Sequence, residues 1–151
     1  MPSLGLIDAA PPINGVATSA TAVMVNGDTI FTVANGPILI QGLVSLCITG
    51  NGATATTIQY SVTPTVGAAP QTISAASGSL LSAAAGASVS LLGTALTTAA
   101  NLNANGPNLG MTAPMFCPAG TIKLVVAVGS TTGTWRHYLY YTALTGDVVV
   151  S

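Results

Sequence analysis

TTIQYSVT, at residues 56–63, alternates polar and apolar side chains from Thr57 to Thr63. Ile58, Tyr60 and Val62 share one side of an extended chain, and threonine, glutamine and serine occupy the other side. Successive side chains of a strand point to opposite faces of a sheet, so this pattern is typical of a strand with one buried face. The stretch therefore predicts a β-strand at the boundary of a hydrophobic core.

The same alternation appears earlier in the chain, in PILIQGLVSLCIT at residues 37–49. It predicts a long strand in which Gly42 marks a bulge or a bend. Cys47 falls on the opposite face, so we expect it to be half-buried. The side chains expected to face the core are Ile38, Ile40, Val44, Leu46 and Ile48.

Two further strands are expected in the C-terminal third, at residues 121–128 and 134–142, and the compact turn 130–133 predicts that they form a hairpin. The inward side chains are expected to be Ile122, Leu124, Val126 and Val128 on the first strand, and Trp135, His137, Leu139 and Tyr141 on the second.

Near the start of the chain, Asn26-Gly27 is a strong turn signal between two short apolar segments, residues 22–25 and 28–33. It predicts another hairpin. After a turn at 144–146, the last short strand is expected to begin at Asp147.

About eight to ten short strands and no convincing amphipathic helix indicate an all-β fold. Antiparallel sheets must be stacked or closed to cover an apolar face, so we expect an antiparallel, jelly-roll-like β-sandwich. Residues 1–20, rich in proline, are expected to form an extended N-terminal arm, and residues 21–151 a single domain.

Residues 64–112 are dominated by alanine, serine, threonine, glycine and asparagine, which predicts a long insertion in that domain. The elements expected within it are short strands at 71–74 and 88–92, a helical turn at 79–85, and a loop at 101–110.

Charge is scarce: 151 residues contain two Lys or Arg and three Asp or Glu, so 3% are charged, and mean hydropathy is +0.70. Nucleic-acid binding requires clustered cations, and a polybasic membrane anchor requires the same, so neither partner is expected. The most apolar window, residues 80–100, is diluted by serine, threonine and glycine, and its ends carry no Lys, Arg or Trp. No membrane helix and no secretory signal are expected.

The residues available for catalysis are few. One histidine, His137, and three aspartates, Asp8, Asp28 and Asp147, are accompanied by no nucleophile motif and no phosphate-binding loop. We therefore expect His137 to be structural, with no catalytic site, no cofactor, no metal site and no small-molecule substrate. The cysteines, Cys47 and Cys117, show no metal-binding spacing and are expected to be free thiols.

Aromatic side chains on both faces of residues 134–142 indicate that one face packs in the core and the other forms an interface. A surface with so little charge offers little repulsion between copies and suits a protein that is usually assembled. The residues expected at interfaces are Leu4, Leu6, Ile7, Ile13, Leu109, Met111, Met115, Phe116, Tyr138 and Tyr140.

Four stretches together resemble small capsid decoration (cement) proteins of tailed bacteriophages. They are TVANGPILIQGLVSLCIT (32–49), ATTIQYSVTPTVGAA (55–69), AGTIKLVV (119–126) and GTWRHYLYYTALTGDVVV (133–150). The resemblance covers roughly residues 20–66 and 113–151.

The resemblance implies a jelly-roll-like sandwich that binds the outer surface of the major capsid protein shell and stabilises it. It also implies a location on the capsid exterior after assembly in the host cytoplasm. Self-association is implied too, with a dimer favoured over a trimer. The alternative function is a β-rich phage fibre or adhesin head that binds a host glycan.

Overall fold

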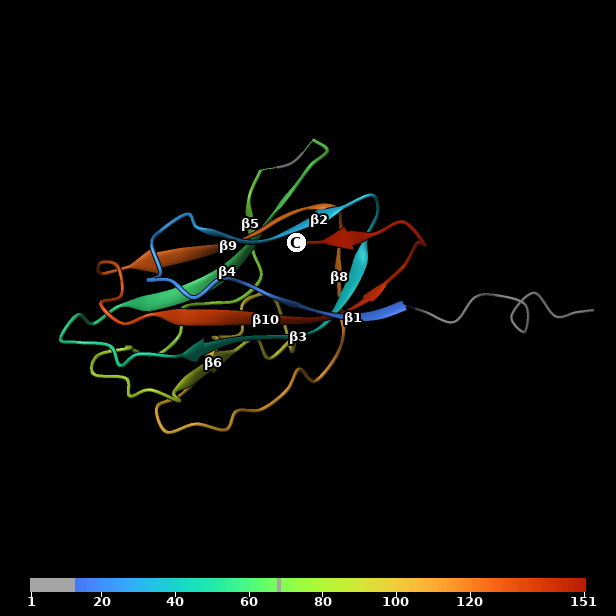
Figure 1. The fold of residues 1–151 in the computed structure, drawn as a ribbon. Helices are drawn as coiled ribbons and strands as arrows, with labels where there is room; N and C mark the ends of the chain where they lie inside the picture. The colour runs from blue at the N-terminus through green and yellow to red at the C-terminus, as the bar shows by residue number, and fades with distance from the viewer. Residues whose placement is uncertain (1–12, 68) are drawn as a thin grey trace, which may run out of the picture.

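The computed structural model describes residues 13–67 and 69–151, and within them the chain forms strands and no helix. Two antiparallel sheets pack face to face as a β-sandwich (Figure 1). The strands are β1 (Ile13–Thr18), β2 (Thr29–Ala34), β3 (Ile38–Cys47), β4 (Thr57–Pro64), β5 (Gln71–Thr72), β6 (Ser88–Ser90), β7 (Asn101–Asn103), β8 (Met115–Cys117), β9 (Gly120–Ala127), β10 (Trp135–Ala143) and β11 (Val149–Val150).

Sheet A has the order β1-β10-β3-β6-β7, with β8 also paired to β3, and sheet B has the order β11-β2-β9-β4-β5. The pairings are nested along the chain. β1 pairs with β10, β2 with β9, β3 with β6 and β4 with β5. The first half of the chain therefore runs back along the second half, and it alternates between the two sheets as it does so.

The alternating stretch that predicts β4 is confirmed, since Ile58, Tyr60 and Val62 are all buried. Ile122, Leu124 and Val126 of β9 are buried opposite them, as expected. The expected inward facing of Val128 is wrong: the residue is exposed and has a φ of 70°, because the chain leaves the sheet after Ala127.

The long strand β3 contains the bulge that Gly42 indicates, and the bulge reverses the facing of everything after it. The pairing with β10 shifts at this point, so Gln41 is the extra residue. A one-residue shift moves each later side chain to the opposite face. Leu43, Ser45 and Cys47 are therefore buried, whereas Val44 and Leu46 are only half-buried and Ile48 is exposed. The expected inward facing of these last three, and the half-burial of Cys47, are wrong.

Both predicted hairpins are wrong, although their turns exist. β9 belongs to sheet B and β10 to sheet A, so turn 130–133 joins the two sheets instead of two paired strands. Asn26-Gly27 does turn the chain, with Gly27 at φ 89°, but the segment before it bridges to β10 through Ala22 and Trp135. Local turn signals do not specify which strand becomes the partner.

The expected arm and insertion both contribute strands to the sandwich. Residues 13–18, placed in the arm, form the edge strand β1, and residues 1–12 lie outside the described residues. Residues 64–112 provide β5, β6 and β7 and bury Leu80, Val89 and Leu91 in the core. Residues 79–85, where a helical turn is expected, form non-helical turns. The expected loop at 101–110 starts with strand β7. No helix long and apolar enough to span a bilayer occurs in the described chain.

Candidate functional site

The outer face of sheet A carries aromatic and aliphatic side chains. Along β10, the core-facing Trp135, His137 and Leu139 alternate with outward-facing residues, among them Tyr138 and Tyr140. Tyr138 lies between Thr18 of β1 and Val44 of β3, and Tyr140 lies between Val16 and Gly42. We name this surface the tyrosine face; its residues are Val16, Val44, Leu46, Tyr138 and Tyr140.

Gly42 shapes the tyrosine face by leaving room for one ring. A Cβ at Gly42 would lie 3.1 Å from Cδ2 of Tyr140, closer than most Cβ contacts. The absence of a side chain lets the Tyr140 ring lie across β3 instead of extending away from the sheet. About half of the Tyr140 side chain remains exposed, so this ring is available to a partner.

The segment that follows β7 packs over strand β6 of sheet A. Ser90 Oγ donates to the carbonyl of Leu109 at 2.9 Å, and the amide of Asn108 donates to the carbonyl oxygens of Ser88 and Asn101. These bonds hold the segment over β6 while the side chain of Leu109 stays 68% exposed. An apolar side chain is thus presented on a loop that is itself ordered by hydrogen bonds.

An apolar hollow lies beside β8. It has a volume of about 200 Å³, and its lining includes Ile73, Leu96, Met115 and Phe116. Leu96 and Phe116 are more than half exposed at the surface, whereas Met115 packs against the core. An exposed apolar hollow of this kind is a typical docking point for an apolar side chain of a partner.

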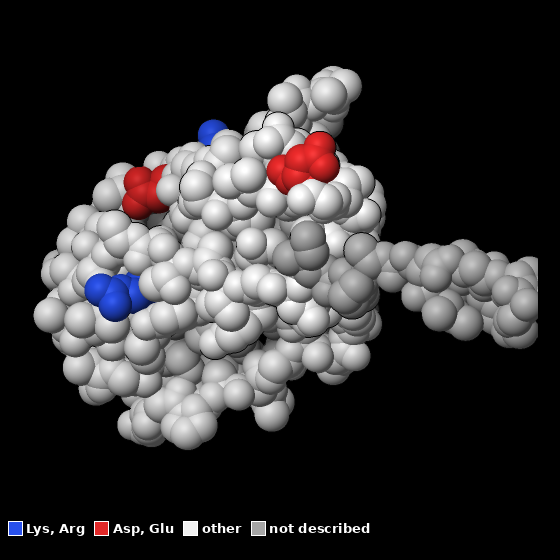
Figure 2. Space-filling model, turned by 45° about the vertical axis from the view of Figure 1, so that its right-hand side comes forward, with Lys and Arg blue, Asp and Glu red and all other residues white. Residues whose placement is uncertain are grey.

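The outer face of sheet B is different in chemistry. Its outward side chains are mostly hydroxyl and amide groups; on β4 and β9 they include Thr57, Gln59, Thr63, Thr121, Lys123 and Val125. Charged side chains appear as isolated patches on an otherwise uncharged surface (Figure 2). Four charged residues lie in the described part of the chain: Asp28, Lys123, Arg136 and Asp147.

A buried polar chain joins the two sheets beneath the tyrosine face. Ser45 Oγ lies 2.7 Å from Nδ1 of His137 and 2.8 Å from the hydroxyl of Tyr60, which donates to the carbonyl of Val89 at 3.0 Å. Burial raises the pKa of Tyr60 well above its usual range, so the phenol stays protonated. Burial lowers the pKa of His137 to about 4, and the nearby charge of Asp28 opposes that shift only in part.

The buried polar chain of Ser45, His137 and Tyr60 provides hydrogen-bond partners for buried polar groups and contains no activated nucleophile. Ser45 gives its proton to one of two neighbours, and His137 is neutral near pH 7 and hydrogen-bonded through Nδ1. Asp28, the aspartate whose charge acts on His137, accepts a hydrogen bond from the backbone amide of Val25. The structure thus places His137 in the core, as a hydrogen-bonded histidine.

The two cysteines are buried and are not joined by a disulfide. Burial raises the pKa of the Cys117 thiol to about 11 and also raises that of Cys47. No group of three or more His, Cys, Asp or Glu side chains converges anywhere in the described ranges.

The expected interface residues divide into three groups. Tyr138, Tyr140, Leu109 and Phe116 lie at the surface, half-buried or exposed. Met111 and Met115 are partly buried and pack against the core, and Met115 also lines the apolar hollow. Leu4, Leu6 and Ile7 lie outside the described residues, and only the backbone of Ile13 is described, as the start of β1.

Sequence reasoning missed Val16, Val44, Leu46 and Leu96 as surface apolar residues. A uniform alternation over residues 37–49 places Val44 and Leu46 on the core face, because it does not include the extra residue of the bulge. Val16 was placed in an arm, and Leu96 sits in a stretch whose composition shows no strand period. A bulge at Gly42 predicts the outward facing of Val44 and Leu46, once its extra residue is counted in the alternation.

No protein-family model matches the chain, and no curated protein and no solved structure matches it either.

Proposed function

We propose that this protein is a structural virion subunit, a capsid decoration protein that binds the outside of a shell of major capsid protein and stabilises it. The observation that carries the proposal is the tyrosine face: exposed tyrosine and valine side chains on a sandwich with hardly any charge. Tyrosine is enriched at protein interfaces, where the ring is buried and the hydroxyl stays hydrogen-bonded.

The strand pairing supports a jelly-roll assignment for the sandwich. A jelly roll arises when one long hairpin folds over into two sheets, so its pairings are nested. The nested pairs β1·β10, β2·β9, β3·β6 and β4·β5, with alternate pairs in alternate sheets, agree with that description.

Two surfaces have separate roles in this proposal. The tyrosine face joins two copies of the chain, because a two-fold axis through this face brings the same residues of both copies into contact. The apolar hollow, with Leu96 and Phe116 at the surface, contacts the shell, and the exposed Leu109 provides a further contact. Two attachment points in one dimer hold more firmly than either alone, so each contact with the shell can be small.

The test is co-sedimentation of the full chain with shells assembled from the major capsid protein encoded in the same genome. The wild type is expected to sediment with the shells. The double variant Leu96→Ser and Phe116→Ser is expected to bind at least tenfold more weakly, since two exposed anchors are removed without opening the core.

The matched control is Leu144→Ser with Val149→Ser, which removes two exposed apolar side chains away from the hollow. It is expected to sediment like the wild type. Failure of the wild-type protein to bind the shells would overturn the proposed function, and equal loss in both double variants would overturn the role of the hollow.

A second candidate function, a phage fibre or adhesin head that binds a host glycan, is favoured by a different observation. A cleft opens at one edge of the sandwich beside His137 and Asp28, away from the apolar hollow. A glycan-binding head requires such a concave site with polar groups.

A further inference from the structure

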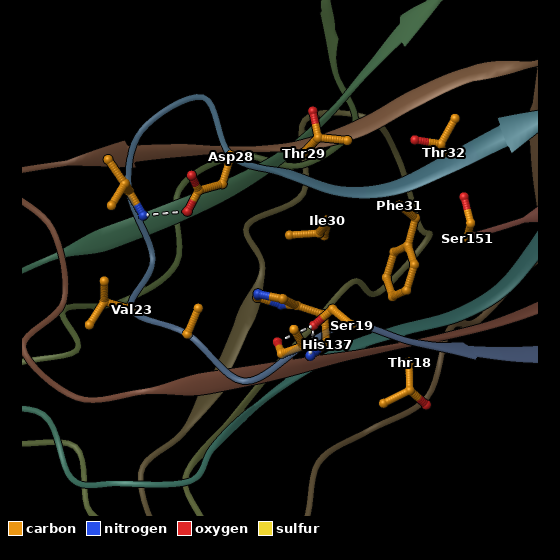
Figure 3. Close-up of a pocket in the computed structure, with 13 residues that line it drawn as sticks. Thr18, Ser19, Val23, Asp28, Thr29, Ile30, Phe31, Thr32, His137 and Ser151 are labelled. Carbon is orange, nitrogen blue, oxygen red and sulfur yellow. Dashed lines mark hydrogen bonds between the residues drawn. The ribbon is translucent and has the colours of Figure 1, made fainter.

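The cleft lies where the two sheets diverge, between the segment that follows β1 and strand β2 (Figure 3). Its volume is about 610 Å³, within the range of sites that hold small ligands. Ser19 and Val23 line it from the segment that follows β1, and Val25, Asp28 and Ile30 line it from the turn that leads into β2 and from β2 itself. The imidazole of His137 lies between these segments in Figure 3.

The buried polar chain determines which ring nitrogen of His137 carries the proton. Tyr60 gives its only hydroxyl proton to the carbonyl of Val89, which can only accept. Ser45 must then donate to the oxygen of Tyr60, and Nδ1–H of His137 must donate to Ser45. This is the one assignment that makes all three hydrogen bonds at once.

It follows that Nε2 of His137 is an unprotonated acceptor. His137 is 5% exposed, and its Nδ1 is turned toward Ser45 in the core. The opposite edge of the ring, which contains Nε2, is therefore the edge that meets the cleft. Because burial lowers the pKa of the ring to about 4, it stays neutral and accepting at neutral pH.

The second acceptor in the cleft is the carboxylate of Asp28. Its Oδ2 accepts the amide of Val25 at 2.8 Å, which orients the group, and Oδ1 takes no part in that bond. No Lys or Arg is among the residues that line the cleft. An anionic ligand is therefore disfavoured, and the ligand must donate hydrogen bonds to two acceptors.

We propose that this cleft binds a neutral, hydroxyl-rich ligand, a pyranose unit of a glycan, whose hydroxyl groups donate to Asp28 and to Nε2 of His137. The half-exposed side chains of Val23 and Val25 at the rim match the C–H faces of a sugar ring. An ammonium ligand fits less well, because the single carboxylate is already shared with a backbone amide and the rim is apolar. The site is separate from the tyrosine face and does not depend on the capsid proposal.

The test is an NMR titration of the full-length chain with D-glucose, D-galactose, D-mannose and N-acetylglucosamine, each to about 50 mM. The chain has one histidine, so imidazole signals belong to His137 alone. Before titration, the ring nitrogens are expected to show a protonated Nδ1 and an unprotonated Nε2. At least one sugar is expected to shift the Nε2 signal in a saturable manner.

The variant that tests the mode of binding is Asp28→Asn, which keeps the shape of the side chain and an oxygen for the Val25 amide. Affinity is expected to fall about tenfold, since the bonds to a charged acceptor are lost. Asp147→Asn is the matched control: it removes a carboxylate that does not line the cleft, and it should bind like the wild type.

Three outcomes would overturn the proposal. The first is an Nε2 signal that none of the four sugars moves, and the second is equal binding by the wild type and Asp28→Asn. The third is saturable binding of methylammonium in a parallel titration where the sugars do not bind, which would make the site a cation site. Loss of shell binding in the co-sedimentation assay leaves these results unaffected, so the two proposals fail separately.

Discussion

The outer faces of the two sheets differ although their inner faces are alike. Inside, both sheets present large apolar side chains, such as Leu139 from sheet A and Leu124 from sheet B, and both are fully packed. Outside, sheet A presents the tyrosine face, whereas sheet B presents mainly threonine and glutamine. The requirement to fold explains the inner faces, because burial of apolar area stabilises any sandwich.

Folding does not explain the outer difference. Threonine has high β-propensity and is compatible with water, so sheet B shows that a strand of this protein can be well formed with a polar outer face. The exposed valine and tyrosine side chains of sheet A are not needed for strand formation. We therefore propose that they contact another molecule, and the following predictions test that difference from the largest expected effect to the smallest.

Replacement of both Tyr138 and Tyr140 by serine should abolish self-association. Buried aromatic anchors dominate the energy of interfaces, so the dissociation constant is expected to rise at least a hundredfold, or about 2.7 kcal/mol. Light scattering at micromolar concentration should give a dimer for the wild type and a monomer for this variant. Gln59→Ser with Val125→Ser, a cross-strand pair on sheet B, should remain dimeric, and a monomer there would remove the distinction between the faces.

Acid should destabilise the fold through His137, which is buried between the two sheets. The pKa of His137 is about 4 in the folded chain against an ordinary value of 6.5, so between these values the unfolded chain binds a proton that the folded chain does not. Stability is therefore expected to fall as pH drops below about 6.5, by roughly 3 kcal/mol in total near pH 4. Denaturant unfolding at several pH values measures this loss.

The variant His137→Gln lacks the titrating ring, so the slope between pH 6.5 and 5 should flatten, whatever its stability at neutral pH. A slope as steep as that of the wild type would show that another group titrates in this range. The Tyr138 and Tyr140 double variant should keep the wild-type slope, since neither tyrosine contributes a hydrogen bond to the buried chain.

Gly42→Ala should weaken association by about tenfold and leave the fold largely intact. The new Cβ would meet the Tyr140 ring at 3.1 Å, and an exposed ring can move away from it, which alters the tyrosine face more than the core. Gly110→Ala is a suitable control, because a Cβ there meets nothing within 4 Å. Equal dimer affinity for the Gly42 variant and the control would indicate that the Tyr140 ring position does not matter.

Salt should have the smallest effect. In the described part of the chain, the charged residue paired with the tyrosine face is Arg136, opposite Leu46, and its Nε donates to Oγ1 of Thr21 at 2.8 Å. Screening acts on charges, so the dimer dissociation constant is expected to change less than about twofold between about 0.05 and 0.5 M salt. A steep salt dependence measured by light scattering would assign the interface to the few charged residues instead.

The strands with clean alternation could be predicted from sequence, and the sites between strands could not. The facing of β4 could be predicted because residues 57–63 alternate without interruption and Ile58, Tyr60 and Val62 are all apolar. β3 was predicted as a strand, but its facing was wrong after Gly42, since the period restarts when Gln41 is inserted. The cleft at His137 combines Asp28, which lies 109 positions earlier in the chain, with a tautomer set by Ser45 and Tyr60, and no local pattern contains that information.

Composition and period by themselves determined that this chain is all-β, that its strands are short, and that charge contributes little to its surface. These properties are local, because alternation and turn residues act within a few positions. Only the tertiary structure decided which strands pair, that residues 64–112 supply strands to both sheets, and which side chains remain outside after the bulge. Pairing depends on contacts between distant segments, so the tyrosine face and the cleft arise only when the sandwich closes.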